Sequence, residues 1–142
     1  MSDTAKKYQQ FPHPSDIGLS IFGDTVEQLF ENAAYGLFDI LCDLEQVTEI
    51  GAVDIDVQGD DRESLLINFL NELLYLQSVN GWLFRRINIT FLEQKTVNAT
   101  AWGEMYKAGT HELFHEIKCA TYHNLHIREE KGQWRVDIVF DV

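Results

Sequence analysis

Two aspartates near opposite ends of the sequence, Asp16 and Asp141, have the chemistry needed to bind a cation. Residues 134–142 alternate apolar and polar side chains, which predicts a strand that ends with Asp141 and the carboxylate of Val142. Asp16 opens another strand-like segment. If the two strands are neighbours, three oxygen-rich groups converge and either bind a hard cation or repel one another. Two plainer roles stay open: Asp16 as a turn cap and Asp141 as the partner of an arginine.

The five residues from His111 read His-Glu-Leu-Phe-His and match the zinc-hydrolase pattern H-E-x-x-H. On a helix, His111 and His115 would lie one turn apart and bind zinc, with Glu112 as general base. The segment instead follows Ala-Gly-Thr and runs into β-rich sequence, and four residues along a strand span roughly 13 Å, too far to share one metal. His123 and His126 also lie on a predicted strand. We therefore predict exposed or half-buried histidines at strand ends, with a zinc hydrolase as a remote alternative.

Acidic residues dominate the charge of the chain. Eleven Lys and Arg against 23 Asp and Glu give a formal net charge of −12. Such a chain is not expected to bind nucleic acid directly, because affinity for the phosphate backbone comes from Lys and Arg. It could dock on a basic protein surface or collect divalent cations, and plain solubility is the alternative explanation.

The two cysteines, Cys42 and Cys119, are far apart and lie in apolar patterns, which indicates free buried thiols in a reducing compartment. The first residues contain no apolar core of a secretory signal, and no window approaches the roughly 18–20 apolar residues that span a bilayer. We expect a cytoplasmic protein that does not enter a membrane. The sequence contains no Gly-rich phosphate loop and no evident Ser-His-Asp order.

The predicted elements must bring the two aspartates together. Residues 16–23 alternate as a strand, and Thr25 and Gln28 form a capping box for a helix that runs to about Leu44. Another alternating strand follows near residues 53–58. Asp60 and Glu63 are then expected to cap a second helix, which the pair Asn-Gly at 80–81 ends.

Everything after Trp82 has the pattern of β-structure, with strands predicted near 87–91, 97–105, 116–129 and 133–142. Lys-Gly at 131–132 suits a hairpin turn between the last two. This order predicts an α+β fold in which two helices pack on a largely antiparallel sheet, as a two-layer sandwich. Residues 1–10 are expected to be a flexible leader, and residues 11–142 a single domain.

Four motifs, in order along the chain, resemble those of the archease family. The sequence His-Pro-Ser-Asp-Ile-Gly at 13–18 is similar to the opening signature His-Thr-Ala-Asp-x-Gly, and residues 23–34 look like its Gly-x-Thr-x-Glu-x-Leu-Phe-x-x-Ala-Ala helix. Lys-Cys-Ala-Thr-Tyr-His at 118–123 resembles Lys-Ala-x-Thr-Tyr-His, with a Cys where the family usually has a small residue. The final Phe-Asp-Val is similar to the family's end, and Asn-Glu-Leu-Leu at 71–74 also fits. The resemblance covers about residues 11–142.

The resemblance implies an accessory protein rather than an enzyme. Archeases assist the RtcB-type RNA ligase in tRNA splicing and RNA repair, where they promote its guanylylation by GTP and its repeated turnover. The implied partner is therefore that ligase, and a chaperone-like modulator of other proteins is the alternative.

The resemblance also implies a divalent cation, with calcium favoured and magnesium or manganese as alternatives. Its ligands would be Asp16, Asp141 and Val142. His13 would orient the site, and Lys118 would lie near the acidic cluster. Oxygen ligands suit these hard cations better than zinc.

Overall fold

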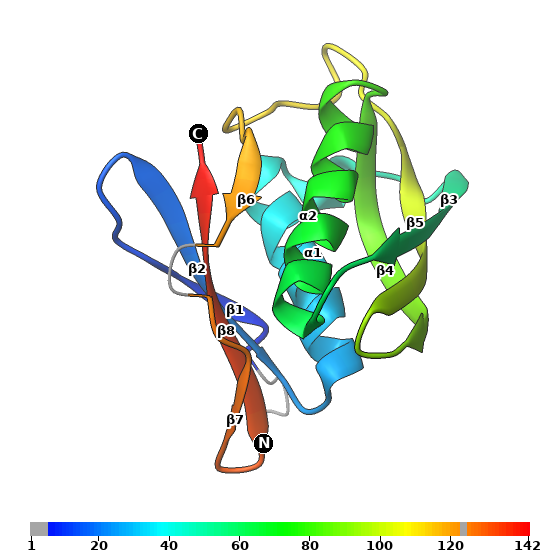
Figure 1. Cartoon of the computed structure of the whole chain (residues 1–142). Helices are drawn as coiled ribbons and strands as arrows, with labels where there is room; N and C mark the ends of the chain where they lie inside the picture. Colours follow the sequence, from blue (N-terminus) through cyan, green and yellow to red (C-terminus); the bar gives the residue numbers. More distant parts are fainter. Residues whose placement is uncertain (1–5, 123–124) are drawn as a thin grey trace, which may run out of the picture.

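The computed structural model describes residues 6–122 and 125–142, and in it two helices lie between two antiparallel sheets (Figure 1). The five-stranded sheet has the order β1-β2-β8-β6, and β7 also pairs with β8. The three-stranded sheet has the order β3-β5-β4. The elements are β1 (Tyr8–Phe11), β2 (Asp16–Gly23), α1 (Val26–Leu41), η1 (Leu44–Gln46), β3 (Gly51–Gln58), α2 (Arg62–Ser78), β4 (Trp82–Leu92), β5 (Thr96–Met105), β6 (Cys119–Thr121), β7 (Arg128–Glu130) and β8 (Gln133–Asp141).

Local sequence signals begin and end both helices. The Thr25 hydroxyl accepts a hydrogen bond from the amide of Gln28 at 3.0 Å, as the capping pattern predicts. At the start of α2 the cap is Asp61, one residue later than expected, because its carboxylate and the Ser64 side chain form a reciprocal capping box. Gly81 has a positive φ of 86°, which ends the second helix as the Asn-Gly pair predicts. The first helix ends at Leu41, short of the expected Leu44, where the backbone becomes extended.

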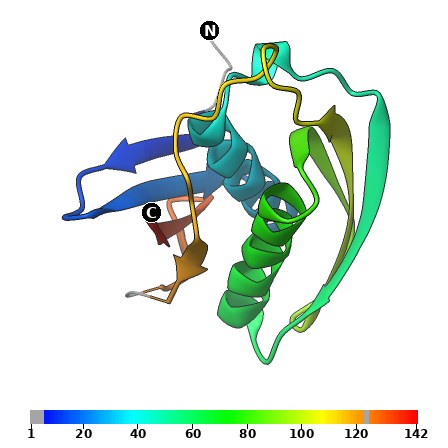
Figure 2. The same ribbon diagram turned by 90° about the horizontal axis from the view of Figure 1, so that it is seen from above.

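The core lies on both sides of the helix pair. Phe30 of α1 packs on Phe69 of α2, with ring centroids 5.8 Å apart, and Phe38 of α1 meets Phe84 of β4 at 5.5 Å. All four rings are fully buried or nearly so. The view from above in Figure 2 shows the helices enclosed by a sheet on each side. A helix in this position must be apolar on more than one face.

The predicted α+β class with antiparallel pairing is confirmed. A single sheet with one layer of helices was expected, whereas the strands form two sheets with the helices between them. Alternation identifies the buried face of a strand, and it does not identify the partner strand. Residues 8–10, expected in a flexible leader, belong to β1, which pairs with β2. The strand expected over 116–129 is reduced to the short β6 and β7.

The β7–β8 hairpin turns at Lys131 and Gly132, whose φ values are 54° and 78°, as the predicted turn requires. Within the described residues, no helix is long and apolar enough to cross a membrane.

Candidate metal centre

Asp16 and Asp141 are register partners at one end of the β2–β8 pair, where the C-terminus is marked in Figure 1. Opposite residues in antiparallel strands have Cα atoms about 4.5–5.5 Å apart and side chains on the same face. The next pair, Ile17 with Phe140, is 6% and 0% exposed and points into the core. The two aspartates therefore share the outer face of the sheet. The structure brings together two residues that are 125 positions apart in the sequence (141 − 16).

A tight turn holds Asp16 at the start of β2. Its amide donates to the carbonyl of His13 at 3.3 Å, and Ser15 between them has a φ of 65°. This left-handed conformation is uncommon for a residue other than glycine. The turn brings His13 Nδ1 to 3.4 Å from Asp16 Oδ2, so the histidine lies where it can orient the carboxylate.

Asp141 is held from the opposite strand, β6. Cys119 is its register partner, and the Cys119 thiol donates to Asp141 Oδ2 at 3.5 Å. The amide of Lys118 donates to the Asp141 carbonyl at 2.8 Å. Burial, followed by the contact with Asp141, raises the pKa of the Cys119 thiol above its ordinary value. The thiol therefore stays protonated near neutral pH and acts as a hydrogen-bond donor.

The plainer role considered for Asp141, an ion pair with an arginine, is not seen among the described residues. The arginines of β7 and β8 pair with other acids. Arg135 and Arg128 lie 3.5 Å and 3.8 Å from carboxylate oxygens of Asp137, and Arg128 also pairs with Glu130. The charge of Asp137 is thus neutralised by these arginines. The Asp141 carboxylate forms no ion pair with another described residue.

The carboxylate oxygens of Asp16 and Asp141 are the kind of ligand that hard divalent cations prefer, and His13 Nδ1 and Cys119 Sγ lie beside them. Two carboxylates come from paired strands, and Val142 follows Asp141 directly. In the part of the chain that the structure describes, no three His, Cys, Asp or Glu side chains are grouped to hold a metal ion. A cation here would therefore need further ligands beside the two aspartates.

Asn71 of α2 closes the far edge of β6, which the sequence reasoning did not anticipate. Its side-chain Oδ1 accepts from the amide of Ala120 at 2.7 Å, and its Nδ2 donates to the Ala120 carbonyl at 3.4 Å. The amide side chain thus takes the place of a neighbouring strand. It fixes β6, and with β6 the Cys119 that contacts Asp141.

Gly18 allows an aromatic ring to lie over the sheet next to Asp16. A Cβ atom at Gly18 would overlap the ring of Phe11, which comes from the register-paired strand β1. Phe11 in turn makes an edge contact with the His13 ring at 6.5 Å between centroids. The glycine of the motif therefore makes room for the side chains around the aspartate.

The H-E-x-x-H segment does not lie on a helix, so it lacks the geometry of a zinc hydrolase. His111 is buried, which corrects the expectation of an exposed or half-buried residue. Its Nδ1 accepts from the Lys107 amide at 2.9 Å, and its Nε2 lies 3.0 Å from the Gln46 carbonyl and 3.1 Å from Glu104. Both ring nitrogens are therefore occupied. His115 is exposed, as expected, and His123 lies outside the described residues.

Comparison with known proteins gives consistent results over the whole chain. The sequence profile of the Archease protein family (MTH1598/TM1083) matches residues 8–142. A protein archease from Pyrococcus furiosus is 36% identical, with 96% of this chain and 99% of that protein covered. A protein archease from Methanosarcina mazei is 34% identical over the full length of both. The solution structure of Methanobacterium thermoautotrophicum protein 1598 superposes with a TM-score of 0.79 at 28% identity, covering 96% of this chain and 99% of that one.

Proposed function

This chain belongs to the archease family, and from that premise we propose that it activates an RtcB-type RNA ligase. In this proposal it promotes guanylylation of the ligase by GTP and its repeated turnover in tRNA splicing or RNA repair. The ligase performs the bond-forming chemistry, and this chain is an accessory protein of the cytoplasm.

The observation that carries the proposal is the register pair of Asp16 and Asp141. The family signature and the end of the chain meet there, although nothing local in the sequence connects them. We propose that these two carboxylates and the carboxylate of Val142 hold a divalent cation, calcium or alternatively magnesium or manganese. Such an ion neutralises carboxylates that would otherwise repel one another.

The charge of the chain supports a protein partner. A net charge of −12 favours a basic protein cleft and disfavours naked RNA. On this basis the acidic end of the β2–β8 pair approaches the ligase, and Asp16 and Asp141 position the ion near the guanylylation site. The side chains of His13 and Cys119 contact the two carboxylates and hold their orientation.

The test is guanylylation of a purified RtcB-type ligase by labelled GTP, with and without this protein. Wild type should increase the amount of guanylylated ligase, and Asp16→Asn and Asp141→Asn should abolish the increase. Asp56→Asn is the matched control, because Asp56 is an exposed aspartate on β3 of the other sheet. Equal guanylylation with and without the wild-type protein would refute the proposed function.

A further inference from the structure

Residues 106–118, which we call the strap, connect β5 to β6 (Figure 2). The strap turns at Gly109 and then passes the C-terminal end of α1. Buried contacts fix the strap at a few points. His111 anchors its first half, the amide of Phe114 donates to the Leu41 carbonyl at 2.8 Å, and Ile117 is only 3% exposed. These contacts hold the backbone of the strap in place against the rest of the fold.

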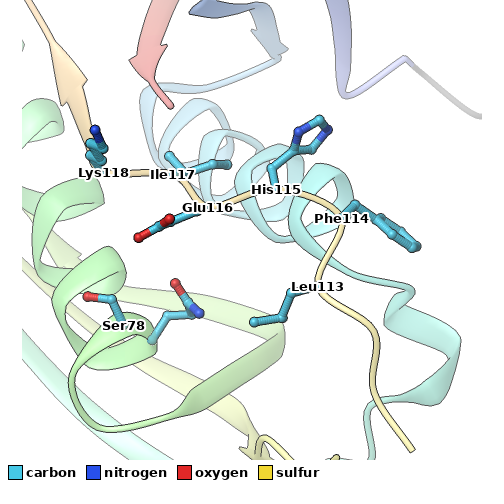
Figure 3. Close-up of a pocket in the computed structure, with 8 residues that line it drawn as sticks. Ser78, Leu113, Phe114, His115, Glu116, Ile117 and Lys118 are labelled. Carbon is cyan, nitrogen blue, oxygen red and sulfur yellow. The ribbon is translucent and has the colours of Figure 1, made fainter. Parts of the chain in front are cut away.

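A groove of about 620 Å³ lies between the strap and the last turn of α2. Gln77 and Ser78 form one wall, and residues 113–118 of the strap form the other. Figure 3 shows Leu113 and Glu116 directed into this space, toward Ser78, whereas Phe114 and His115 point away from it. The groove thus offers an apolar wall beside a carboxylate.

The main chain along the groove is open to hydrogen bonding. His115 and Glu116 are exposed, and within the described residues their amides and carbonyls form no main-chain hydrogen bond with another segment. Such an extended segment can pair with an added strand, which supplies main-chain hydrogen bonds while pockets select the side chains.

The groove combines exposed apolar surface with unneutralised acid. Leu113, which is directed into the groove, is 40% exposed. Glu116 is exposed, and it forms no ion pair with another described residue. Lys118 is the basic side chain among the residues that line the groove. A complementary occupant would carry a large apolar side chain and a neighbouring Lys or Arg.

The groove also leads to the candidate metal centre. Its last lining residue, Lys118, donates its amide to the carbonyl of Asp141. One end of the groove therefore lies next to the main chain of Asp141.

From these features we propose that the groove binds an extended segment of the protein partner, with an apolar anchor against Leu113 and a basic side chain against Glu116. The inference rests on the proposed function, in which the partner is the RtcB-type ligase. The metal centre then acts on the ligase, and the groove holds the ligase in place.

The test compares the affinity of four full-length variants for a purified RtcB-type ligase by calorimetry. Leu113→Ala and Glu116→Lys should each weaken binding at least about tenfold, as expected for an anchor and its charged neighbour. Ile50→Ala and Glu93→Lys are the matched controls, because both residues are exposed and neither lines the groove. They should change the affinity by less than about twofold. Amide hydrogen exchange of His115 and Glu116 should also slow in the complex.

The outcomes separate the two proposals. If wild type binds and activates the ligase while Leu113→Ala and Glu116→Lys behave like their controls, the groove is not the docking site, and the proposed function stands. If wild type does not bind the ligase, both proposals fail. A dimer of the free protein in sedimentation that Leu113→Ala dissociates would assign the groove to a second copy and would also overturn the inference.

Discussion

Substitution of Asn71 by Ala tests whether the side-chain clamp on β6 supports the candidate metal centre. The Ala120 amide, on a residue that is 4% exposed, would lose the acceptor that now lies at 2.7 Å. A buried donor left without a partner costs about 1–3 kcal/mol. The second bond of the clamp, at 3.4 Å, is long and adds little. Alanine is the better helix former, which returns roughly 0.5 kcal/mol.

We therefore expect Asn71→Ala to lower the free energy of unfolding by about 0.5–2.5 kcal/mol. For a chain of this size the midpoint of thermal unfolding should fall by roughly 2–8 °C. The assay is urea and thermal unfolding followed by circular dichroism. Faster amide exchange at Ala120 would locate the loss on β6.

Asn68→Ala is the matched control, because Asn68 lies almost one turn earlier on α2 and donates to the Gln58 carbonyl at 2.9 Å from an exposed position. The change in helix propensity is the same in both variants. An exposed hydrogen bond is readily replaced by water, so this variant should lose no more than about 0.5 kcal/mol. Equal losses in the two variants would refute the claim that Asn71 acts through a buried amide.

Four further outcomes follow from the structure. Ca²⁺ at a concentration of about 100 times its Kd should stabilise wild type by about 2.7 kcal/mol but leave the stability of Asp16→Asn unchanged, as measured by thermal unfolding. Equal shifts of the two proteins would show that Asp16 does not bind the ion. Gly18→Val should destabilise the fold by about 2 kcal/mol or more in urea, because its side chain overlaps the Phe11 ring, and a neutral effect would contradict that contact. The hydrogen bond from the Thr48 amide holds the pKa of Glu104 below its ordinary value. The ionised Glu104 carboxylate therefore stabilises the fold above the ordinary pKa, and this stabilisation is lost as the pH falls through the lowered pKa. The difference in stability between wild type and Glu104→Gln, measured by urea titration, should shrink over that range. In filter binding at physiological salt the protein should not retain naked tRNA, and tight retention would contradict the charge argument.

Local patterns in the sequence determined much of the secondary structure. The hydroxyl cap at Thr25, the left-handed Gly81 and the Lys-Gly hairpin are decided by residues within a few positions of each other, so they can be read from the sequence. Alternation likewise predicted strands at the positions of β2 and β8. The position of α1 between two sheets was not readable, because an apolar face does not specify which element will cover it.

The same division holds for the candidate site. The sequence by itself identified Asp16 and Asp141 by residue type and by resemblance, and the terminal strand by alternation. Only the tertiary structure decided that they are register partners, that Cys119 joins the same row, and that Asn71 closes the edge beyond it. It also decided that His111 is buried with both ring nitrogens bonded, whereas the sequence predicted an exposed or half-buried residue at a strand end. Strand pairing and burial depend on contacts between residues far apart in the chain, and no local pattern encodes these contacts.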